Sequence, residues 1–301
     1  MIKITHTGFN NNFDLIRLFA ALQVVVLHYI FHFDLEISPI WEPITTLLGW
    51  FPGVPIFFVV SGYLVSKSLE RSPSLYSYAV NRFLRIFPAL WVCLAISLTT
   101  VLLSGYWTIY PPIWSKLLLW VSSELAFGHI YSSALFSEYG VGKLNGSLWT
   151  IPIELQFYLI LPFIFLCSRW ITERTSFRTT TIIVSLIAFV ALIAMSFFLA
   201  QYTDTFLGKL AEKNILTYLL FFVFGWAAHR HNDFLLNIVA GRFLVFLTLY
   251  IFFMLFYAGS NTLFVKPYDL LQISLLTFVI FSAAYTMPNL SARMLGSVDI
   301  S

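Results

Sequence analysis

The chain has 301 residues, of which 59% are hydrophobic and only 10% are charged. Soluble domains carry about 25% charged residues, so this composition excludes an ordinary soluble protein and indicates a membrane protein. The net charge of +3 is small and no basic cluster occurs, so no nucleic-acid partner is expected.

Apolar runs that are long enough to cross a bilayer recur along the whole sequence. Eight of them are expected to cross: Phe13–Phe33, Trp50–Ser68, Phe83–Ser104, Leu148–Ser168, Thr181–Ala200, Asn214–His229, Phe243–Gly259 and Asp269–Met287. We therefore predict an all-α fold, a polytopic bundle of about eight transmembrane helices that forms one domain over residues 1–301. Because the chain stops soon after the last run, in MLGSVDIS, we expect its C-terminal end to be incomplete.

A ninth run, Ile113–Tyr131, is short and contains Lys116 and Glu124. If it does not cross and the N-terminus is cytoplasmic, the arginines fall in or beside cytoplasmic segments, as the positive-inside rule requires. These are Arg17, Arg71, Arg82, Arg85, Arg169, Arg174, Arg178, Arg230, Arg242 and Arg293. We therefore predict that the ninth run is an interfacial or re-entrant segment on the outer side of the membrane.

The two cysteines, Cys93 and Cys167, both lie within apolar runs. This pattern indicates neither a disulfide framework nor a cysteine-based metal site. We expect both to be small, buried side chains.

The first run carries Arg17 and His28 inside its apolar sequence. Eleven residues on a helix make about 1100°, or three turns plus roughly 20°, so both side chains lie on one face, about 16 Å apart along the axis. Ionisable groups at membrane depth are costly unless they face a protein interior or a water-filled cavity, so both are functional candidates. Alternatively, Arg17 extends to the cytoplasmic interface and His28 is a core histidine bonded to a carbonyl. His32 shares the face of His28, but no carboxylate accompanies them at a suitable spacing, so no metal site is expected.

Glu154 is the acidic residue of the fourth run, in the segment NGSLWTIPIELQFYLILP. Counted at 1.5 Å per residue, Glu154 and His28 both lie roughly 8–9 Å below the outer boundary. We therefore predict a pair in which the carboxylate orients and charges the imidazole. The alternative is a glutamate that bonds to the backbone of a neighbouring helix. Pro152 is expected to free a backbone carbonyl and to kink the helix beside this site.

Two further motifs have both a structural and a functional interpretation. In FFVVSGYL, residues 57–64, Ser61 and Gly62 let another helix or a ligand approach closely, and spacing alone favours ordinary helix packing. Arg82 and Arg85, at the cytoplasmic start of the third run, share a helix face. They can clamp phosphates or only fix the topology, and spacing alone favours the second interpretation.

With these stretches in view, the chain resembles the membrane-bound acyltransferase 3 family over essentially its whole length. The motif R-x10-H matches Arg17 and His28, FF-x-x-SG-[FY]-L matches residues 57–64, and R-x-x-R matches Arg82 and Arg85. The segment S-L-W-[ST]-x-x-x-E…FY…P matches Ser147, Leu148, Trp149, Thr150, Glu154, Phe157, Tyr158 and Pro162. All four motifs occur in the family's order, which makes the resemblance specific.

The resemblance implies an activity and a role for these residues. Family members move an acyl group, often acetyl, from cytosolic acyl-CoA to a hydroxyl of an extracytoplasmic glycan or glycolipid. By this resemblance, His28 is the essential histidine, Arg17 is its partner in the motif, and Glu154 is the essential acidic residue. Arg82 and Arg85 form the donor-binding pair. The family usually has more transmembrane helices than the eight expected here.

These inferences combine into one hypothesis for the enzyme. The donor is acyl-CoA, with acetyl-CoA as the first candidate, and the other partners are the lipid bilayer and a glycan or glycolipid acceptor. The pantetheine arm of the donor extends along the Arg17–His28 face, and His28 acts as general base on the acceptor hydroxyl while Glu154 orients it. On the substrate side the candidates are Ser61, Gly62, Trp149 and Tyr158.

Two other classes of function remain open at this stage. A transporter or flippase for a polar lipid or sugar intermediate would use intramembrane Arg, His and Glu as a proton or substrate path. An internal repeat would support that alternative, and the sequence shows none. A non-catalytic membrane scaffold would not need Arg17, His28 and Glu154 at those depths.

Overall fold

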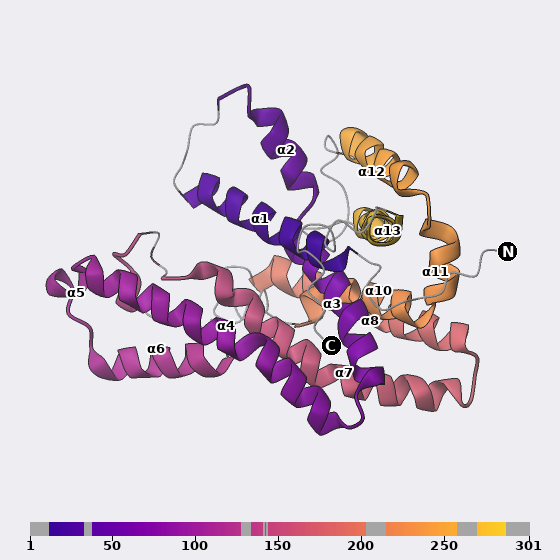
Figure 1. Ribbon diagram of the computed structural model, residues 1–301, viewed down its shortest axis with the longest axis horizontal. Helices are drawn as coiled ribbons and strands as arrows, with labels where there is room; N and C mark the ends of the chain where they lie inside the picture. Colours follow the sequence, from indigo (N-terminus) through magenta and orange to yellow (C-terminus); the bar gives the residue numbers. More distant parts are fainter. Residues whose placement is uncertain are drawn as a thin grey trace, which may run out of the picture. The chain divides into compact units, whose positions relative to one another are not determined.

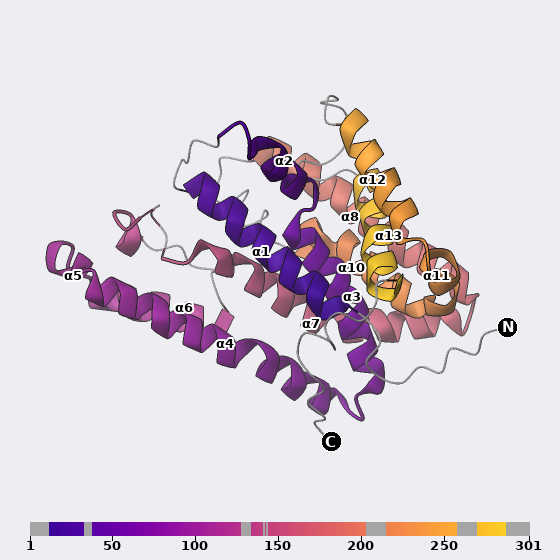
Figure 2. The same ribbon diagram turned by 45° about the horizontal axis from the view of Figure 1, so that its top comes forward.

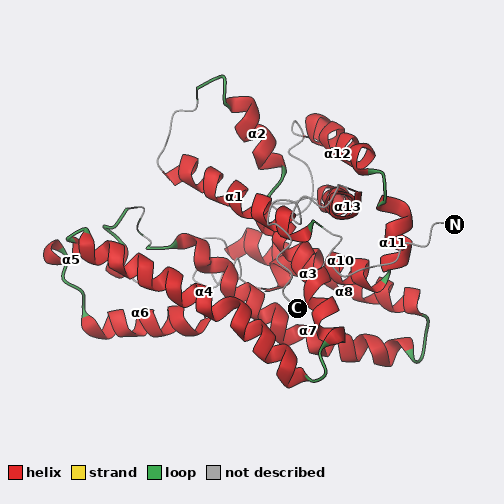
Figure 3. Ribbon diagram, viewed as in Figure 1, coloured by secondary structure: helices red, strands yellow, loops and turns green. Residues whose placement is uncertain are grey.

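A computed structural model describes residues 12–32, 38–127, 134–140, 142, 144–202, 215–257 and 270–286. Figures 1 and 3 show that these ranges are built from helices and contain no strand. The α-helices are α1 (Phe13–His32), α2 (Glu42–Trp50), α3 (Gly53–Arg71), α4 (Leu75–Leu103), α5 (Tyr106–Ile109), α6 (Trp114–Phe127), α7 (Thr150–Thr172), α8 (Phe177–Tyr202), α10 (Ile215–Arg230), α11 (Asn232–Val239), α12 (Phe243–Tyr257) and α13 (Leu270–Thr286). Two 3₁₀ helices, η1 (Ala134–Phe136) and η2 (Gly146–Trp149), lie between α6 and α7.

Several of these helices are long and apolar enough to cross a membrane, which confirms the predicted all-α polytopic fold. Among the described residues five segments meet that condition, or six if α11 and α12, bent by 80° at their junction, count as one span. α10 and α13, with 16 and 17 residues, are shorter than a typical span. The expected number of eight crossings therefore stays a prediction.

By their internal contacts the residues group into two compact units. Unit 1 comprises Met1–Ser66, Thr181–Ala200 and Tyr218–Ser301, and unit 2 comprises Lys67–Thr180 and Gln201–Thr217. The prediction of a single domain over the whole chain stays a prediction.

In unit 1, α1 runs antiparallel to α3. Near the start of α1, the ring of Phe13 lies 5.0 Å from the ring of Tyr63. One turn later, the guanidinium carbon of Arg17 lies 5.8 Å from the ring centroid of Phe57. The contacting residue on α3 moves back from Tyr63 to Phe57 as α1 proceeds, so the two helices have opposite directions. The Arg17 side chain therefore lies over the first aromatic ring of the SG motif.

A buried glutamine that the sequence analysis did not single out joins three helices of unit 1. The side-chain amide of Gln23 donates a hydrogen bond to the carbonyl of Leu48 (3.0 Å) and accepts one from the N–H of Gly53 (2.9 Å). The first N–H groups of a helix have no partner within the helix. Gln23 therefore caps the start of α3 and holds the end of α2, a helix that the sequence analysis did not predict.

Two glycines allow α3 and α10 to meet backbone to backbone. A Cβ atom on Gly62 would overlap the carbonyl of Phe222, and one on Gly225 would overlap the carbonyl of Val59. Small residues at crossing points serve this purpose in membrane helices, where close packing replaces the hydrophobic driving force. The interpretation of the SG pair as a helix-packing motif is therefore confirmed for Gly62.

In unit 2, α4 is a helix of 29 residues that begins eight residues before the predicted start at Phe83. Its cap is Ser74, whose hydroxyl oxygen accepts a hydrogen bond from the N–H of Ser77 at 3.1 Å. The placement of Arg82 and Arg85 at the start of this helix is therefore wrong, because both lie two to three turns inside it. The first turns of α4 are too polar for a hydropathy criterion to find.

The segment predicted to remain on the outer side forms α6, which has 14 residues and is too short to cross a bilayer. Figures 1 and 2 both show α6 beside the second half of α4, joined to it through α5. The indole N–H of Trp91 donates to the carbonyl of Leu125 at 3.2 Å, and Trp120 packs in a buried cluster with Leu94 and Val101. This hairpin agrees with the prediction that residues 113–131 do not cross the membrane. Their location on its outer side stays a prediction.

Two expectations about unit 2 are wrong. Cys93 is half-buried and Cys167 is exposed, although both were expected to be buried. An apolar position in a membrane helix can face lipid, so burial in protein does not follow from hydropathy. Pro152 lies in the first turn of α7, where its missing N–H breaks no helical hydrogen bond, whereas Pro162 is the proline inside the helix.

We expect Gly62→Ala to destabilise unit 1, because the new methyl group meets the backbone of α10 rather than a movable side chain. The free energy of unfolding should fall by about 1–3 kcal/mol. Thermal unfolding of the purified protein in detergent would measure the change. Gly49→Ala is the matched control, since Gly49 also lies in a helix and a Cβ there meets nothing within 4 Å. Equal stability of the two variants would contradict the packing argument.

Candidate active site

The site in unit 2 is built on the antiparallel pair α4 and α7. The hydroxyl of Tyr78 donates to the carbonyl of Tyr158 at 3.1 Å, and the side-chain N–H of Asn145, just before η2, donates to the sulfur of Cys93 at 3.2 Å. From Tyr78 to Cys93 along α4, the contacting residue therefore moves back from Tyr158 to Asn145, so the two segments are antiparallel. This register brings Arg82 on α4 to the level of the first turns of α7.

Glu154 and Tyr158 lie one turn apart on α7 and interact directly. The phenol hydroxyl of Tyr158 donates a hydrogen bond to a carboxyl oxygen of Glu154. The guanidinium carbon of Arg82 lies over the Tyr158 ring, 5.4 Å from its centroid. The positive charges of Arg85 and Arg82 both act on the Glu154 carboxyl group. Two of the motifs therefore form one charged cluster in unit 2.

Arg82 is held in place by its surroundings, whereas Arg85 is exposed. The side chain of Arg82 is half-buried, and its Nη2 donates to the hydroxyl oxygen of Ser68 at 3.1 Å. The Nε of Arg82 is buried and has no hydrogen-bond partner among the described residues. With two arginines and one carboxylate, the cluster has room for a further anionic group.

This arrangement contradicts the expected separation of Glu154 from the two arginines, whereas the depth of Glu154 in the membrane stays a prediction. From the sequence, Glu154 was expected near the outer end of its helix and the two arginines near the cytoplasmic end of theirs. The α4–α7 register places Arg82, Arg85 and Glu154 together instead. The physical reason is that a carboxylate in a spanning helix is costly without a compensating charge, and the early start of α4 brings the arginines to it.

The residues of the first motif lie in unit 1. Arg17 and His28 are on one continuous helix, as predicted; Arg17 is half-buried and His28 is exposed. The Nε of Arg17 is buried without a hydrogen-bond partner in the described part of the chain. His28 and Glu154 belong to different units, and their pairing stays a prediction.

The predicted substrate-side residues are distributed over both units. Ser61 is buried and Gly62 is packed on α10 in unit 1. Trp149 ends η2 and is half-buried, and Tyr158 is buried with its ring on Arg82 and its hydroxyl on Glu154. Their expected contacts with substrate stay predictions.

A polar cluster in unit 1 was missed by the sequence analysis. Tyr63, the tyrosine of the SG motif, donates a hydrogen bond to Asn232 at 2.9 Å and shares one with the hydroxyl of Tyr285. The ring of His229 stands edge-on to Tyr63, with 5.3 Å between centroids. Only Tyr63 belonged to a motif noted in the sequence, and its partners Asn232 and Tyr285 are far from it in the chain.

Residues 10–298 match the family described as Acyltransferase domain. The chain belongs to this family. The motifs quoted above therefore lie within a matched region that covers nearly the whole acyltransferase. The two classes left open by the sequence, a transporter and a scaffold, find no support in this match.

The acyltransferase is similar to curated proteins of bacteria and of a phage. It is 32% identical to nodulation protein 10 of Rhizobium leguminosarum bv. viciae, over 94% of this chain and 78% of that protein. It is 35% identical to the O-acetyl transferase of Shigella phage Sf6, over 50% of this chain and 44% of that protein. It is 30% identical to the peptidoglycan O-acetyltransferase OatA of Listeria monocytogenes serovar 1/2a, over 52% of this chain and 24% of that protein.

The chain thus spans less than half the length of these two O-acetyltransferases. No solved structure matches the chain. Family membership and the relatives identify a multi-pass membrane enzyme of the O-acetyltransferase class.

The electrostatic interaction between Glu154 and the arginines should appear as a coupling energy. In a double-mutant cycle of Arg85→Ala and Glu154→Gln, the double variant should be more stable than the sum of the single losses predicts, by about 1 kcal/mol. Unfolding in mixed detergent micelles would measure it. The control cycle uses Arg169 and Glu173, an exposed pair on α7 at 3.5 Å, for which about 0.3–0.5 kcal/mol is expected. A coupling no larger than the control would contradict the cluster.

Proposed function

We propose that the chain transfers an acetyl group from cytosolic acetyl-CoA to a hydroxyl of an extracytoplasmic glycan or glycolipid. The observation that carries this proposal is the cluster of Arg82, Arg85, Glu154 and Tyr158 in a pair of spanning helices. A purely structural ion pair needs one arginine for one carboxylate. This cluster has a second, exposed arginine, which is available to an anionic ligand.

The donor phosphates are the proposed ligand of the two arginines. Arg85 is exposed and Arg82 presents a buried Nε that has no partner in the described residues. Guanidinium groups bind phosphate through paired N–H donors, which are stronger than neutral hydrogen bonds. Because α4 is expected to start on the cytoplasmic side, this position suits a donor that arrives from the cytosol.

Glu154 has two roles in this proposal, and both depend on its charge. Within unit 2 it holds the arginine pair in position through direct electrostatic attraction and through Tyr158. The sequence also predicts that Glu154 orients His28. The first role acts on binding of the donor and the second acts on the chemical step, so kinetics can separate them.

His28 is the proposed general base, with Arg17 eleven residues earlier on the same helix. The acceptor hydroxyl attacks the thioester carbonyl of the donor as His28 removes its proton. An ester C–O bond forms and the C–S bond breaks. The thiolate of CoA leaves and takes up the proton, so the acetyl ester and free CoA are the products.

The acceptor is proposed from the relatives. One of them is named as a peptidoglycan O-acetyltransferase and another as an O-acetyl transferase, and we extend a glycan hydroxyl to this chain. Trp149 beside α7 and Ser61 in unit 1 are the candidates for contact with that acceptor. The membrane is proposed to be the bacterial inner or plasma membrane, with the N-terminus in the cytoplasm.

The transfer itself can be measured with labelled acetyl-CoA on membranes that contain the protein. We expect His28→Ala to lower the rate of acetyl incorporation into glycan by about 10²–10⁴-fold, the usual contribution of a general base. His32→Ala is the control, since His32 is on the same helix but outside the motif. If His28→Ala kept the wild-type rate, the base would have to be another group.

Donor binding should depend on the arginines and not on the histidine. We expect Arg82→Ala/Arg85→Ala to abolish binding of CoA to the purified protein, and His28→Ala to retain it. Arg169→Ala, which removes an exposed arginine of α7, is the control for lost charge.

The two proposed roles of Glu154 give different kinetic results. Glu154→Gln should raise the KM for acetyl-CoA if Glu154 positions the arginines, and should lower kcat alone if it acts only on His28. A donor affinity that survives both arginine changes would contradict the proposed donor site.

A further inference from the structure

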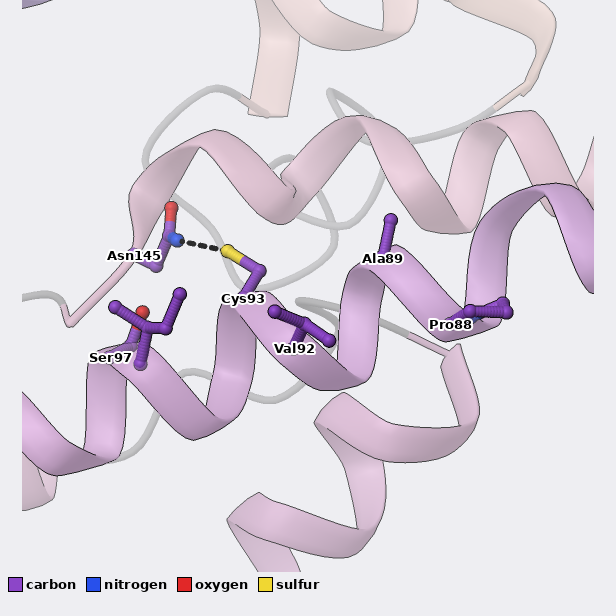
Figure 4. A pocket seen from close by; sticks show the side chains of 7 residues that line it. Pro88, Ala89, Val92, Cys93, Ser97 and Asn145 are labelled. Carbon is purple, nitrogen blue, oxygen red and sulfur yellow. Dashed lines mark hydrogen bonds between the residues drawn. The ribbon is translucent and has the colours of Figure 1, made fainter.

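α4 carries a groove on its surface that the proposed reaction has not used. The groove has a volume of about 680 Å³ and is lined by Pro88, Ala89, Val92, Cys93, Ile96, Ser97 and Asn145. All of these except Asn145 belong to α4. Figure 4 shows Cys93 and Asn145 facing one another across it, joined by the hydrogen bond between them.

The groove continues the stripe of α4 on which the donor arginines lie. Arg85, Ala89, Cys93 and Ile96 follow one another at intervals of three or four residues, so they share one helix face. Arg82 precedes Arg85 by three residues on the same face. From Arg85 to Ser97 the stripe is about 18 Å long, counted at 1.5 Å per residue.

The two ends of this stripe differ in chemistry. At the N-terminal end are two arginines, one of them exposed. The groove itself is apolar along Ala89, Val92 and Ile96, with a hydroxyl from Ser97 and an amide from Asn145 at its far end. A ligand that fits this pattern has phosphates at one end and a long, thin chain that is mostly apolar but carries a few hydrogen-bonding groups.

We propose that this groove holds the pantetheine arm and the acyl group of acyl-CoA, with the thioester end near Cys93 and Asn145. The inference rests on the proposed donor, and it changes the expected path of the arm. The sequence analysis placed the arm along the Arg17–His28 face of α1. Continuity with the arginines instead assigns it to the face of α4 that begins at Arg85.

Charge decides between acyl-CoA and a membrane lipid as the occupant. The apolar lining alone would suit a lipid chain, but such a chain would not use the hydrogen-bonding groups of Ser97 and Asn145 at the far end of the groove. The two arginines exceed the charge of Glu154, so a ligand with phosphates at that level is favoured. An apolar chain without phosphates would leave this excess uncompensated.

The two native cysteines provide a direct test. In a Cys167→Ser background, alkylation of Cys93 by a small, membrane-permeant thiol reagent should slow about tenfold when acetyl-CoA is present at ten times its Kd. Cys167 in a Cys93→Ser background is the matched control, since it is exposed on α7 and outside the groove. Its rate should not change. Arg82→Ala/Arg85→Ala should remove the protection of Cys93.

A pair of substitutions on α4 tests the same groove without cysteine chemistry. Ala89→Leu fills the groove and should raise the KM for acetyl-CoA about tenfold or more, because the larger side chain occupies volume that the pantetheine arm would need. Ala95→Leu adds the same volume at another exposed position of α4 outside the groove, and should leave the KM unchanged.

The outcomes separate this inference from the proposed function. If acetyl-CoA binds through Arg82 and Arg85 but leaves Cys93 reactive and Ala89→Leu without effect, the groove assignment is wrong and the donor site stands. If acetyl-CoA does not bind at all, both are wrong. Protection of Cys93 by lipid vesicles alone, with no effect of acetyl-CoA, would assign the groove to lipid and overturn the inference.

Discussion

The charge of Glu154 constrains unit 2 more than any other group. A carboxylate in a spanning helix has no water to solvate it, so it must be protonated or compensated. The positive charges of Arg82 and Arg85 act on this carboxyl group, and Tyr158 connects it to Arg82 by a hydrogen bond and a cation–π contact. The long, capped α4 is the means by which the arginines reach this depth. The excess of one positive charge then makes the same cluster suitable for an anion.

Unit 1 depends on a different constraint, which is close packing in the absence of a hydrophobic driving force. Gly62 and Gly225 bring the backbones of α3 and α10 into contact, and Gln23 satisfies the first N–H of α3 across a gap between helices. The bond between Gln23 and Gly53 joins α1 to α3, and the Arg17 side chain lies over Phe57 on the same helix pair. In the SG motif, Gly62 thus packs against a helix while the next residue, Tyr63, makes polar contacts.

The two units divide the functional motifs between them. The histidine motif is on α1, whereas the arginine motif and Glu154 are on α4 and α7. The proposed reaction suits such a division, because the proposed donor site belongs to one group of helices and the proposed base to another. The groove on α4 follows the proposed donor arginines along the same helix, over residues 88–97.

The sequence by itself determined the all-α membrane fold, the continuous helix that carries Arg17 and His28, and the motifs that indicate an acyltransferase. These depend on hydropathy, on helical periodicity and on local spacing, which are properties of neighbouring residues. It did not determine the start of α4, the exposure of Cys167 or the proximity of Glu154 to the arginines. Hydropathy cannot report a capped polar turn, nor does it distinguish a lipid-facing side from a packed one. The register of α4 on α7 was decided only by tertiary structure, because the compensation of a buried charge depends on helices that are distant in the chain.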